Sequence, residues 1–502
     1  MRQTSGRGWA SVATLAVLAL SLGGNAASEG QPESAAAAVA RDPEVRAALA
    51  EADALLAAKL EEHRLPGMSA VVVCGQDVLW AKGYGYADLE QEIPATPNTV
   101  YDVGSVSKVF TATALMILRD AGVVTLDDPV EKHLPEFQVQ RRPDDAGPPT
   151  LKHLAAHMAG LPHQPAGIEV DAWPPLEEAL IGLRTEDLFI PTFSDRKYSN
   201  VGFGVLGNAL GRAAGRPYTD YVREHIFVPL GMRSSAWVAT DEMKEHLAVG
   251  YDPIAEDGTR GRSLGYEPGE GGAPAGGLLT SARDMARFMS AYLYEGPAGD
   301  GHILAGSTVR ELRHPVFVAR GWKFGQGIGW MFWPDGEGRT IMAHGGGRPG
   351  FTAKVNIVPD LRLGVFVAIN ERAAIDSVAD PALWVIAPAV AAAWERWEAA
   401  QPPPPLPAGL EPWLGLYELD PPVEGQRVEL ALEEGWLRVF VLEKGERAYP
   451  ARLVPLAEAT FRVQGGPSDG EKVVLERDPA SGQVLMQIGG FTVVKAPEEE
   501  ND

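Results

Sequence analysis

A serine and a lysine three residues apart stand at the head of an apolar segment, and this pair could carry out nucleophilic catalysis. Ser105 and Lys108 precede residues 109–118, which read VFTATALMIL. If that segment is a helix, side chains three residues apart lie on one face, so the lysine nitrogen can reach the serine hydroxyl. A serine hydroxyl is a weak nucleophile until a base removes its proton during attack. The spacing predicts a nucleophile beside its base.

Lysine acts as a base only when it is neutral. Its ordinary pKa near 10.4 must then fall by roughly 3 units, on the order of 4 kcal/mol, through burial and nearby positive charge. We expect the helix N-terminus at Ser105 to contribute, because its unpaired N–H groups carry partial positive charge and also suit an oxyanion. The pattern is short, so a capped helix start with a surface lysine is the alternative interpretation.

Two more segments carry side chains that could join this chemistry. Tyr198, Ser199 and Asn200 follow a polar stretch and precede the small-residue run VGFGVLG, which indicates a loop entering a helix. Residues 344–351 read HGGGRPGF, and residues 352–359 alternate like a strand with a turn beyond it.

The order S-x-x-K, then Y-x-N about 90 residues on, then H-x-G about 145 residues later, resembles the penicillin-recognising serine hydrolases. The chain looks most similar to their class C β-lactamase and esterase-like branch. Further likenesses are TLKHLAAHMAGLP at 150–162, LDDPV at 126–130 and PAGGLLTSARDM at 274–285, over roughly residues 45–395 in all. The resemblance implies an α/β (α+β) fold of the β-lactamase/transpeptidase type, an antiparallel sheet flanked by helices plus a helical lobe.

The resemblance also implies roles for individual residues. Ser105 would be the acylated nucleophile and Lys108 its activating partner. Tyr198 would share the proton transfer, with its phenolate favoured by the lysine charge. Asn200 would hold the amide or ester side chain of the substrate and help to position Lys108.

The same resemblance assigns the third motif to substrate binding. The backbone N–H groups of Ser105 and Gly347 would form the oxyanion hole, where losing one donor typically costs about 10²–10³ in rate. His344, Gly346 and Arg348 would contact the substrate. No cofactor and no metal are implied.

The third motif departs from the K-T-G of true β-lactamases and carboxypeptidases. Lysine is replaced by His344 and threonine by Gly345, so both groups that usually bind a substrate carboxylate are changed. Arg348 could replace the charge, because arginine grips a carboxylate bidentately. We expect β-lactams to be poor substrates, and an ester or a peptide-like amide to be better ones.

Competing motifs have weaker support. Residues 202–207 fit G-x-G-x-x-G, but no strand precedes them as the dinucleotide fingerprint requires. His153 and His157 have the spacing of zinc ligands on a helix, but Leu154 stands where a metalloprotease has glutamate, which favours core or surface histidines. Residues 344–347 read HGGG without a G-x-S-x-G elbow, so we reject an α/β-hydrolase. Three tryptophans could line a cleft or pack in the core: Trp322, Trp330 and Trp333.

The N-terminus predicts export. Residues 1–27 combine two arginines, an apolar core and a small-residue end, which is the layout of a secretory signal peptide. We therefore expect a periplasmic or extracellular protein, with no integral span after the signal is removed. A retained N-terminal anchor is the alternative, although the apolar core is short for a membrane span. Cys74 is the one cysteine and cannot form an internal disulfide.

The net charge indicates which partners to expect, and proline-rich and glycine-rich stretches indicate the domain boundaries. The net charge of −23 makes nucleic acid an unsuitable partner, so we expect a small ester, amide or peptide substrate. An amphipathic helix is predicted from Asp42 to about residue 63, and a strand hairpin follows over 67–86. The hydrolase domain is predicted over 42–400, a proline-rich linker over 401–407, and a small β-barrel or sandwich over 408–502. The sequence leaves the oligomeric state open.

Three functions follow in order of support. The first is an exported, metal-independent serine hydrolase that works through an acyl-enzyme on Ser105. The second is a penicillin-binding or sensor protein that is acylated with little turnover, since no dedicated deacylating glutamate is identifiable. The third is an interaction protein with a vestigial site.

Overall fold

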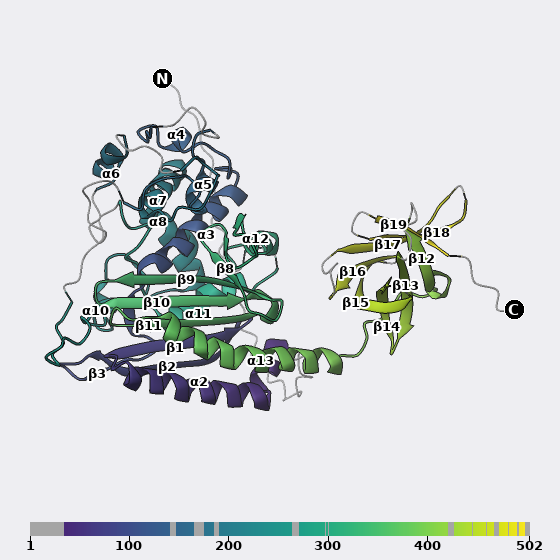
Figure 1. Ribbon diagram of the computed structural model, residues 1–502, viewed down its shortest axis with the longest axis horizontal. Coiled ribbons are helices and arrows are strands. Elements are labelled where there is room, and N and C mark those ends of the chain that lie inside the picture. Colours follow the sequence, from purple (N-terminus) through teal and green to yellow (C-terminus); the bar gives the residue numbers. More distant parts are fainter. Residues whose placement is uncertain are drawn as a thin grey trace, which may run out of the picture. The chain divides into compact units, whose positions relative to one another are not determined.

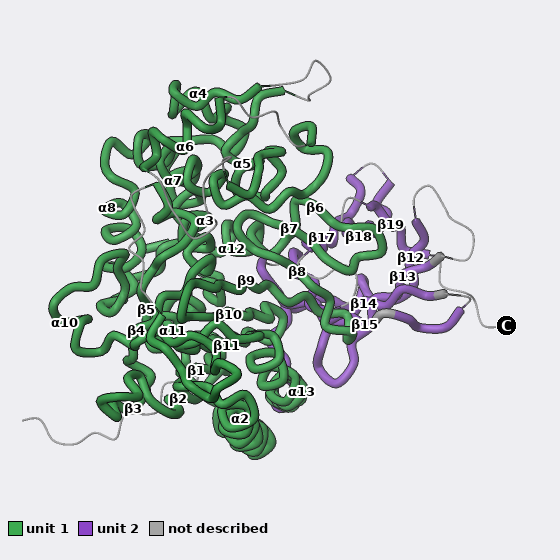
Figure 2. Tube along the Cα trace, turned by 60° about the vertical axis from the view of Figure 1, so that its left-hand side comes forward, with its two compact units in different colours: residues 1–397 green, residues 398–502 purple. Residues whose placement is uncertain are grey.

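The computed structural model describes residues 35–140, 147–164, 175–184, 190–263, 271–296, 298–299, 301–419, 426–443, 445–457, 459–465, 471–479, 481–488 and 491–496. The predicted signal peptide lies outside these residues. The chain divides into two compact units, residues 1–397 and 398–502, which are coloured separately in Figure 2. The linker predicted over 401–407 lies just beyond this division.

The first unit is built on an antiparallel nine-stranded sheet in the order β3-β2-β1-β11-β10-β9-β8-β7-β6. Its strands, in chain order, are β1 (Gly67–Cys74), β2 (Asp77–Asp88), β3 (Ile93–Pro94), β6 (Phe317–Val318), β7 (Gly325–Gln326), β8 (Met331–Pro334), β9 (Thr340–Arg348), β10 (Phe351–Val358) and β11 (Leu363–Ile369). A separate pair is formed by β4 (Val100–Asp102) and β5 (Leu279–Ser281). The predicted hairpin over 67–86 is β1 and β2, and its turn contains Gly75 at a φ of +56°.

One face of the sheet is covered by α2 (Pro43–Glu62) and α13 (Asp376–Ala400), which Figure 1 shows running alongside β1 and β2. The start of α2 is fixed by Asp42, whose side chain accepts the Glu44 N–H at 2.9 Å, with Pro43 at the first helical position. Apolar residues of both helices pack on β1 and β11; among them are Val45, Leu56, Val378, Ile386 and Val390.

The opposite face carries α3 (Ser107–Asp120), α11 (Ala282–Tyr292) and the helical lobe. In Figure 1 the labels α4 to α8 gather on this side, away from α2 and α13. The remaining helices are α1 (Ala35–Arg41), α4 (Val130–His133), α5 (Leu151–Ala155), α6 (Leu176–Leu183), α7 (Asn200–Ala214), α8 (Tyr218–Val222), α9 (Val228–Leu230), α10 (Asp241–Lys244) and α12 (Gly306–Leu312). This is the predicted sheet flanked by helices with a helical lobe, and the predicted fold class is confirmed.

The second unit is a closed antiparallel barrel of β12 to β19 in chain order. The strands are β12 (Gly415–Leu419), β13 (Gln426–Glu433), β14 (Trp436–Glu443), β15 (Glu446–Ala457), β16 (Thr460–Gln464), β17 (Lys472–Arg477), β18 (Val484–Ile488) and β19 (Phe491–Lys495). Alternating strand residues fill its interior, including Tyr417, Leu437, Leu453 and Phe461. The sequence is compatible with either a barrel or a sandwich, and the pairing of β12 with β19 closes the strands into a barrel.

Among the described helices, α13 is long and apolar enough to cross a membrane by length and composition. Half of its most apolar window is buried within the protein. That burial suits a helix packed on a sheet.

Candidate active site

Ser105 lies in a 3₁₀ turn, Gly104–Val106, and α3 begins two residues later at Ser107. Ser105 was expected at the N-terminus of the α-helix, but it lies in the 3₁₀ turn that precedes the helix. Two hydrogen bonds stabilise the turn. The Gly104 N–H donates to Asp102 Oδ1 at 2.9 Å, and the Ser107 hydroxyl donates to the Gly104 carbonyl at 2.7 Å. Gly104 itself has a φ of +51°. A glycine is suited to that backbone conformation.

Lys108 reaches Ser105 as predicted. Its Nζ lies 2.9 Å from Ser105 Oγ and donates to the Ala275 carbonyl at 2.6 Å. The side chain is fully buried, and burial lowers the pKa of Lys108 well below its usual range. Burial therefore favours the neutral amine beside the serine, which is the state that can take its proton.

Tyr198 joins the pair from the loop before α7. Lys108 Nζ lies 5.1 Å from its ring centroid, and an interaction with Ser105 favours the ionised form of its hydroxyl. Burial raises the pKa of Tyr198 to about 12, against the lowering effects of the Ser105 hydrogen bond and the Arg196 charge. The expected phenolate is therefore not favoured in this geometry, because burial disfavours the charged form of the phenol. Tyr198 is a neutral phenol.

The rings of two histidines, His157 and His163, pack near Tyr198. From the sequence, His157 was interpreted as a core or surface residue, and His163 was not singled out. The ring of His157 lies 4.2 Å and that of His163 5.8 Å from the Tyr198 ring. The Ser199 N–H donates to His157 Nδ1 at 3.2 Å, which ties the Tyr198 loop to the segment before it. Burial lowers the pKa of His157 well below its usual range, so it stays neutral. Its place in the resembling segment 150–162 was the available clue.

Asn200 is the first residue of α7, whose N-cap is Ser199. Its Nδ2 lies 3.2 Å from His163 Nε2, and its buried Oδ1 has no hydrogen-bond partner among the described residues. Lys108 hydrogen-bonds Ser105 and the Ala275 carbonyl within the described residues, so a backbone carbonyl takes the positioning role that was predicted for Asn200. An unpartnered buried oxygen is suited to accept an N–H or O–H from a bound molecule.

The third motif forms a free strand edge. In the described sheet β8 pairs with β9 from Thr340 to Ala343, and beyond that β9 has only β10 beside it. A Cβ on Gly346 would meet the Val103 carbonyl oxygen at 1.9 Å and the Ser105 nitrogen at 2.8 Å. A Cβ on Gly104 would meet the Gly347 nitrogen at 2.7 Å. The backbones of the nucleophile turn and the strand therefore touch, which brings the two predicted oxyanion-hole residues, Ser105 and Gly347, side by side.

His344 lines the pocket but carries no positive charge. Its Nδ1–H donates to the Gly345 carbonyl at 2.7 Å, which leaves Nε2 without a proton in the neutral ring. Burial, followed by the nearby Lys108, lowers the pKa of His344 to about 3. The residue in the usual lysine position is therefore neutral, which agrees with the expectation that carboxylate recognition is altered here.

Arg348 does not line the pocket, and its predicted contact with the substrate is corrected. Its side chain is 5% exposed, and its Nε lies 3.3 Å from Asp102 Oδ2. Asp102 also accepts the Gly104 N–H, so this buried ion pair joins the nucleophile turn to the end of β9. The guanidinium is committed to the protein because a buried carboxylate beside it needs the opposite charge.

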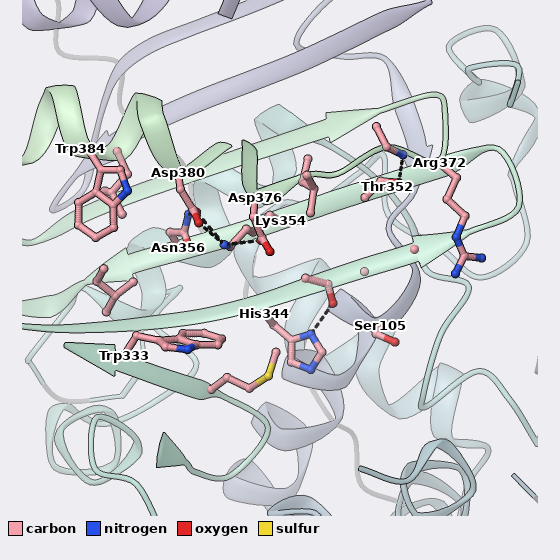
Figure 3. A pocket seen from close by; sticks show the side chains of 18 of the residues that line it. Ser105, Trp333, His344, Thr352, Lys354, Asn356, Arg372, Asp376, Asp380 and Trp384 are labelled. Atoms are coloured by element: carbon pink, nitrogen blue, oxygen red, sulfur yellow. Dashed lines mark hydrogen bonds and ion pairs between the residues drawn. The ribbon is translucent and has the colours of Figure 1, made fainter. Parts of the chain in front are cut away.

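A pocket of about 760 Å³ opens over these residues, and Figure 3 shows it from close by. Ser105, Tyr198, His344 and the three glycines of β9 line it. It also takes in residues that the sequence analysis did not single out, among them Lys354, Asn356, Asp376, Asp380 and Trp384. No local motif marks them, because they meet only where β10 packs on α13.

The competing motifs fall inside structural elements. Residues 202–207 lie within α7, where a Cβ on Gly207 would meet Pro274 at 2.2 Å, so helix packing explains the small residue. In the described part of the chain no three His, Cys, Asp or Glu side chains gather as a metal site. Trp330 is fully buried, Trp322 packs on the core and Trp333 lines the pocket.

Comparisons with known proteins agree with this geometry. Residues 52–387 match the family model described as Beta-lactamase. The chain is 29% identical over 342 residues to the Beta-lactamase-like protein 2 of Dictyostelium discoideum, covering 64% of this chain and 59% of that protein. It is 29% identical over 316 residues to the D-alanyl-D-alanine-carboxypeptidase/endopeptidase AmpH of Escherichia coli strain K12, covering 61% of this chain and 79% of that protein.

Solved structures give the same fold. The class C beta lactamase from Rhodobacter sphaeroides is similar with a TM-score of 0.55 and 26% identity, over 70% of this chain and 99% of that one. The octameric penicillin-binding protein homologue from Pyrococcus abyssi is similar with a TM-score of 0.58 and 24% identity, over 89% of this chain and 100% of that one. The second likeness extends beyond the first unit.

Proposed function

The chain belongs to the Beta-lactamase family of serine hydrolases, and on that premise we propose that it cleaves an ester or amide bond through an acyl-enzyme on Ser105. The observation that carries the proposal is the 2.9 Å contact between Ser105 Oγ and a Lys108 nitrogen that is fully buried with a lowered pKa. A neutral amine at hydrogen-bond distance is the base that a serine nucleophile needs.

The reaction then runs in two halves. Ser105 Oγ attacks the carbonyl carbon while its proton passes to Lys108 Nζ, and the N–H groups of Ser105 and Gly347 hold the oxyanion. The bond to the leaving group breaks, and the leaving oxygen or nitrogen takes a proton from the Tyr198 hydroxyl, which regains one from Lys108. Water repeats the attack on the acyl-serine, releases the acid and restores the free hydroxyl.

The substrate we propose is an ester or a peptide-like amide, with weak or no action on β-lactams. The neutral His344 and the internally paired Arg348 support this, because neither offers a positive charge to a substrate carboxylate. The carboxypeptidase/endopeptidase activity in the name of the Escherichia coli relative also supports an amide substrate.

The proposal also includes export, because residues 1–27 have the layout of a signal peptide. The mass of the protein recovered from the periplasm or medium of an expressing bacterium tests it. A mass that lacks about the first 27 residues is expected. A full-length protein held in the cytoplasm would contradict export.

Mass spectrometry of the protein with an activated ester, an acyl-D-alanyl peptide and a penicillin tests the hydrolase. We expect turnover of the ester or the peptide and an acyl adduct on Ser105 at short times. Both should vanish in Ser105→Ala and persist in the matched control Ser481→Ala, an exposed serine in the barrel. Full activity in Ser105→Ala would overturn the proposal.

A sensor that is acylated with little turnover is the second candidate. It is favoured by one observation: the carboxylates that line the described pocket, Asp376 and Asp380, are paired with Lys354, and no glutamate lines it. An adduct that persists for hours without released product would support the sensor. Steady release of product would exclude it.

A further inference from the structure

The pocket continues past the catalytic residues to the other face of the sheet. Figure 3 shows Ser105 and His344 on one side of the strand that bears the glycines, and Lys354, Asp376, Asp380 and Trp384 on the other side. The register explains this, since His344 pairs with Val355 and Gly345 with Lys354, and successive residues of a strand point to opposite faces. We call the part of the pocket lined by α13, by the residues just before α13 and by the α13-facing residues of β8, β9 and β10 the distal arm.

The pocket is continuous past β9 because two of its glycines, Gly345 and Gly347, leave space that a side chain could fill. At Gly346 a Cβ would strike the Val103 carbonyl at 1.9 Å, so the backbone contact demands glycine there. At Gly347 a Cβ would meet nothing within 4 Å, and at Gly345 its nearest neighbour would be the Ala353 carbonyl at 3.9 Å. A side chain at Gly345 or Gly347 would therefore project into free space, and the bare strand edge leaves the groove continuous.

Indole rings and aliphatic side chains give the distal arm flat apolar walls. Trp384 on α13 and Trp333 on β8 both line the pocket, together with Ile341, Ile375 and Leu383. Trp384 is 44% exposed although it lies on a helix that buries most of its apolar residues in the core. An exposed indole beside a cavity offers a stacking surface.

The polar groups of the distal arm carry charges of both signs. Lys354 Nζ donates to Asp376 Oδ1 at 2.7 Å and to Asp380 Oδ2 at 2.8 Å, and Asn356 Nδ2 donates to Asp380 Oδ1 at 3.2 Å. Arg372 also lines the pocket, and Figure 3 shows its guanidinium apart from the cluster of Lys354, Asp376 and Asp380. The side chain of Asp376 is 77% exposed, which leaves oxygen atoms open to hydroxyl donors. A ligand with a net charge would meet repulsion as well as attraction.

We propose that the distal arm is a subsite for an uncharged saccharide portion of the substrate. A pyranose ring has C–H faces that suit an indole and a rim of hydroxyls that suits carboxylate and amide groups. The inference rests on the proposed function, in that the bond cleaved at Ser105 would join the acyl group to such a saccharide or to a chain that carries it.

Kinetics with a length series of substrates tests the subsite. The probes are acetyl esters of glucose, cellobiose and cellotriose, acetyl esters of straight-chain alcohols of matching length, and 4-nitrophenyl acetate as the measure of hydrolysis itself. We expect kcat/KM to rise along the saccharide series and not along the alkyl series. Trp384→Ala should remove about tenfold of that rise, because the ligand loses most of one indole contact. Gly345→Thr should remove it by narrowing the passage.

Phe491→Ala is the matched control, because it removes an exposed aromatic ring from the barrel and should leave the rise intact. No rise with saccharide length, or an equal rise along the alkyl series, would overturn the proposal. If 4-nitrophenyl acetate and every ester fail to react, the esterase activity is refuted, and calorimetric binding of cellotriose by Ser105→Ala still decides the subsite. Binding that is lost with the added Trp384→Ala supports the subsite, and absence of binding refutes it.

Discussion

The buried base gives the sharpest prediction, through replacement of Lys108 by methionine. Methionine keeps much of the volume and removes the amine, so Lys108→Met abolishes the acylation base and also the proton linkage. Lys108 is buried and its pKa is lowered by burial. The unfolded chain therefore binds one more proton than the folded protein between the lowered pKa and the ordinary value near 10.4.

The sign follows from that proton. Because the unfolded state binds more protons in this window, the free energy of unfolding of the wild type rises with pH there. The slope that Lys108 contributes is up to about 1.4 kcal/mol per pH unit, and it ends near pH 10.4. The loss of the hydrogen bond to the Ala275 carbonyl adds a constant offset to the variant, which does not change the slope.

Urea unfolding of both proteins from pH 7 to pH 10.5 is the assay. Subtracting the variant from the wild type cancels the contribution of the C-terminal barrel and of every other titrating group, which the two chains share. We expect the difference to change with the stated slope, and the wild-type rate of ester hydrolysis to rise through the same apparent pKa. A difference that is flat over this pH range would show an ordinary lysine and would refute the assignment of Lys108 as the base.

Four further outcomes follow from individual contacts. Arg348→Met should lower the free energy of unfolding in urea by about 3–5 kcal/mol, because Asp102 is left buried without its partner; a loss under about 1 kcal/mol would mean that the pair is not buried in solution. Tyr198→Phe should lower kcat by about 10²–10⁴ with an unchanged Tm, and an unaltered kcat would remove the phenol from the proton path. His344→Gln should leave the pH–rate profile between pH 5 and 7 unshifted, since the pKa of His344 lies at about 3; the loss of an ionisation near 6 in the variant would contradict this. Gly346→Ala should fail to fold or should have a much lower Tm than the wild type, whereas Gly347→Ala should have a Tm near that of the wild type. Equal Tm values for the two variants would refute the close backbone contact at Gly346.

The regular elements were largely readable from the sequence. The helix predicted from Asp42 is α2, because an aspartate cap and a following proline define a helix start locally. The small β domain predicted over 408–502 is the barrel of β12 to β19. The bounds of its longest strand, β15, were harder to predict, because it contains prolines at 450 and 455 that a local pattern takes as a break.

The site was readable only in part. The spacing of Ser105 and Lys108 places the two side chains together through one turn of local backbone, so their contact needed no tertiary information. The state of Tyr198 did need it, because a pKa depends on how completely the whole fold removes water from the ring. Arg348 is the same case, since its partner Asp102 is far away in the chain.

The sequence by itself determined which residues could do chemistry and which elements carry them, because helix caps, strand alternation and motif spacing act over short stretches of chain. It also determined that the third motif lacks a lysine. The tertiary structure alone decided the protonation states, the burial of Arg348 and the reach of the pocket across β9 to Trp384. Those properties arise from solvent exclusion and from contacts between β10 and α13, which no local stretch of sequence contains.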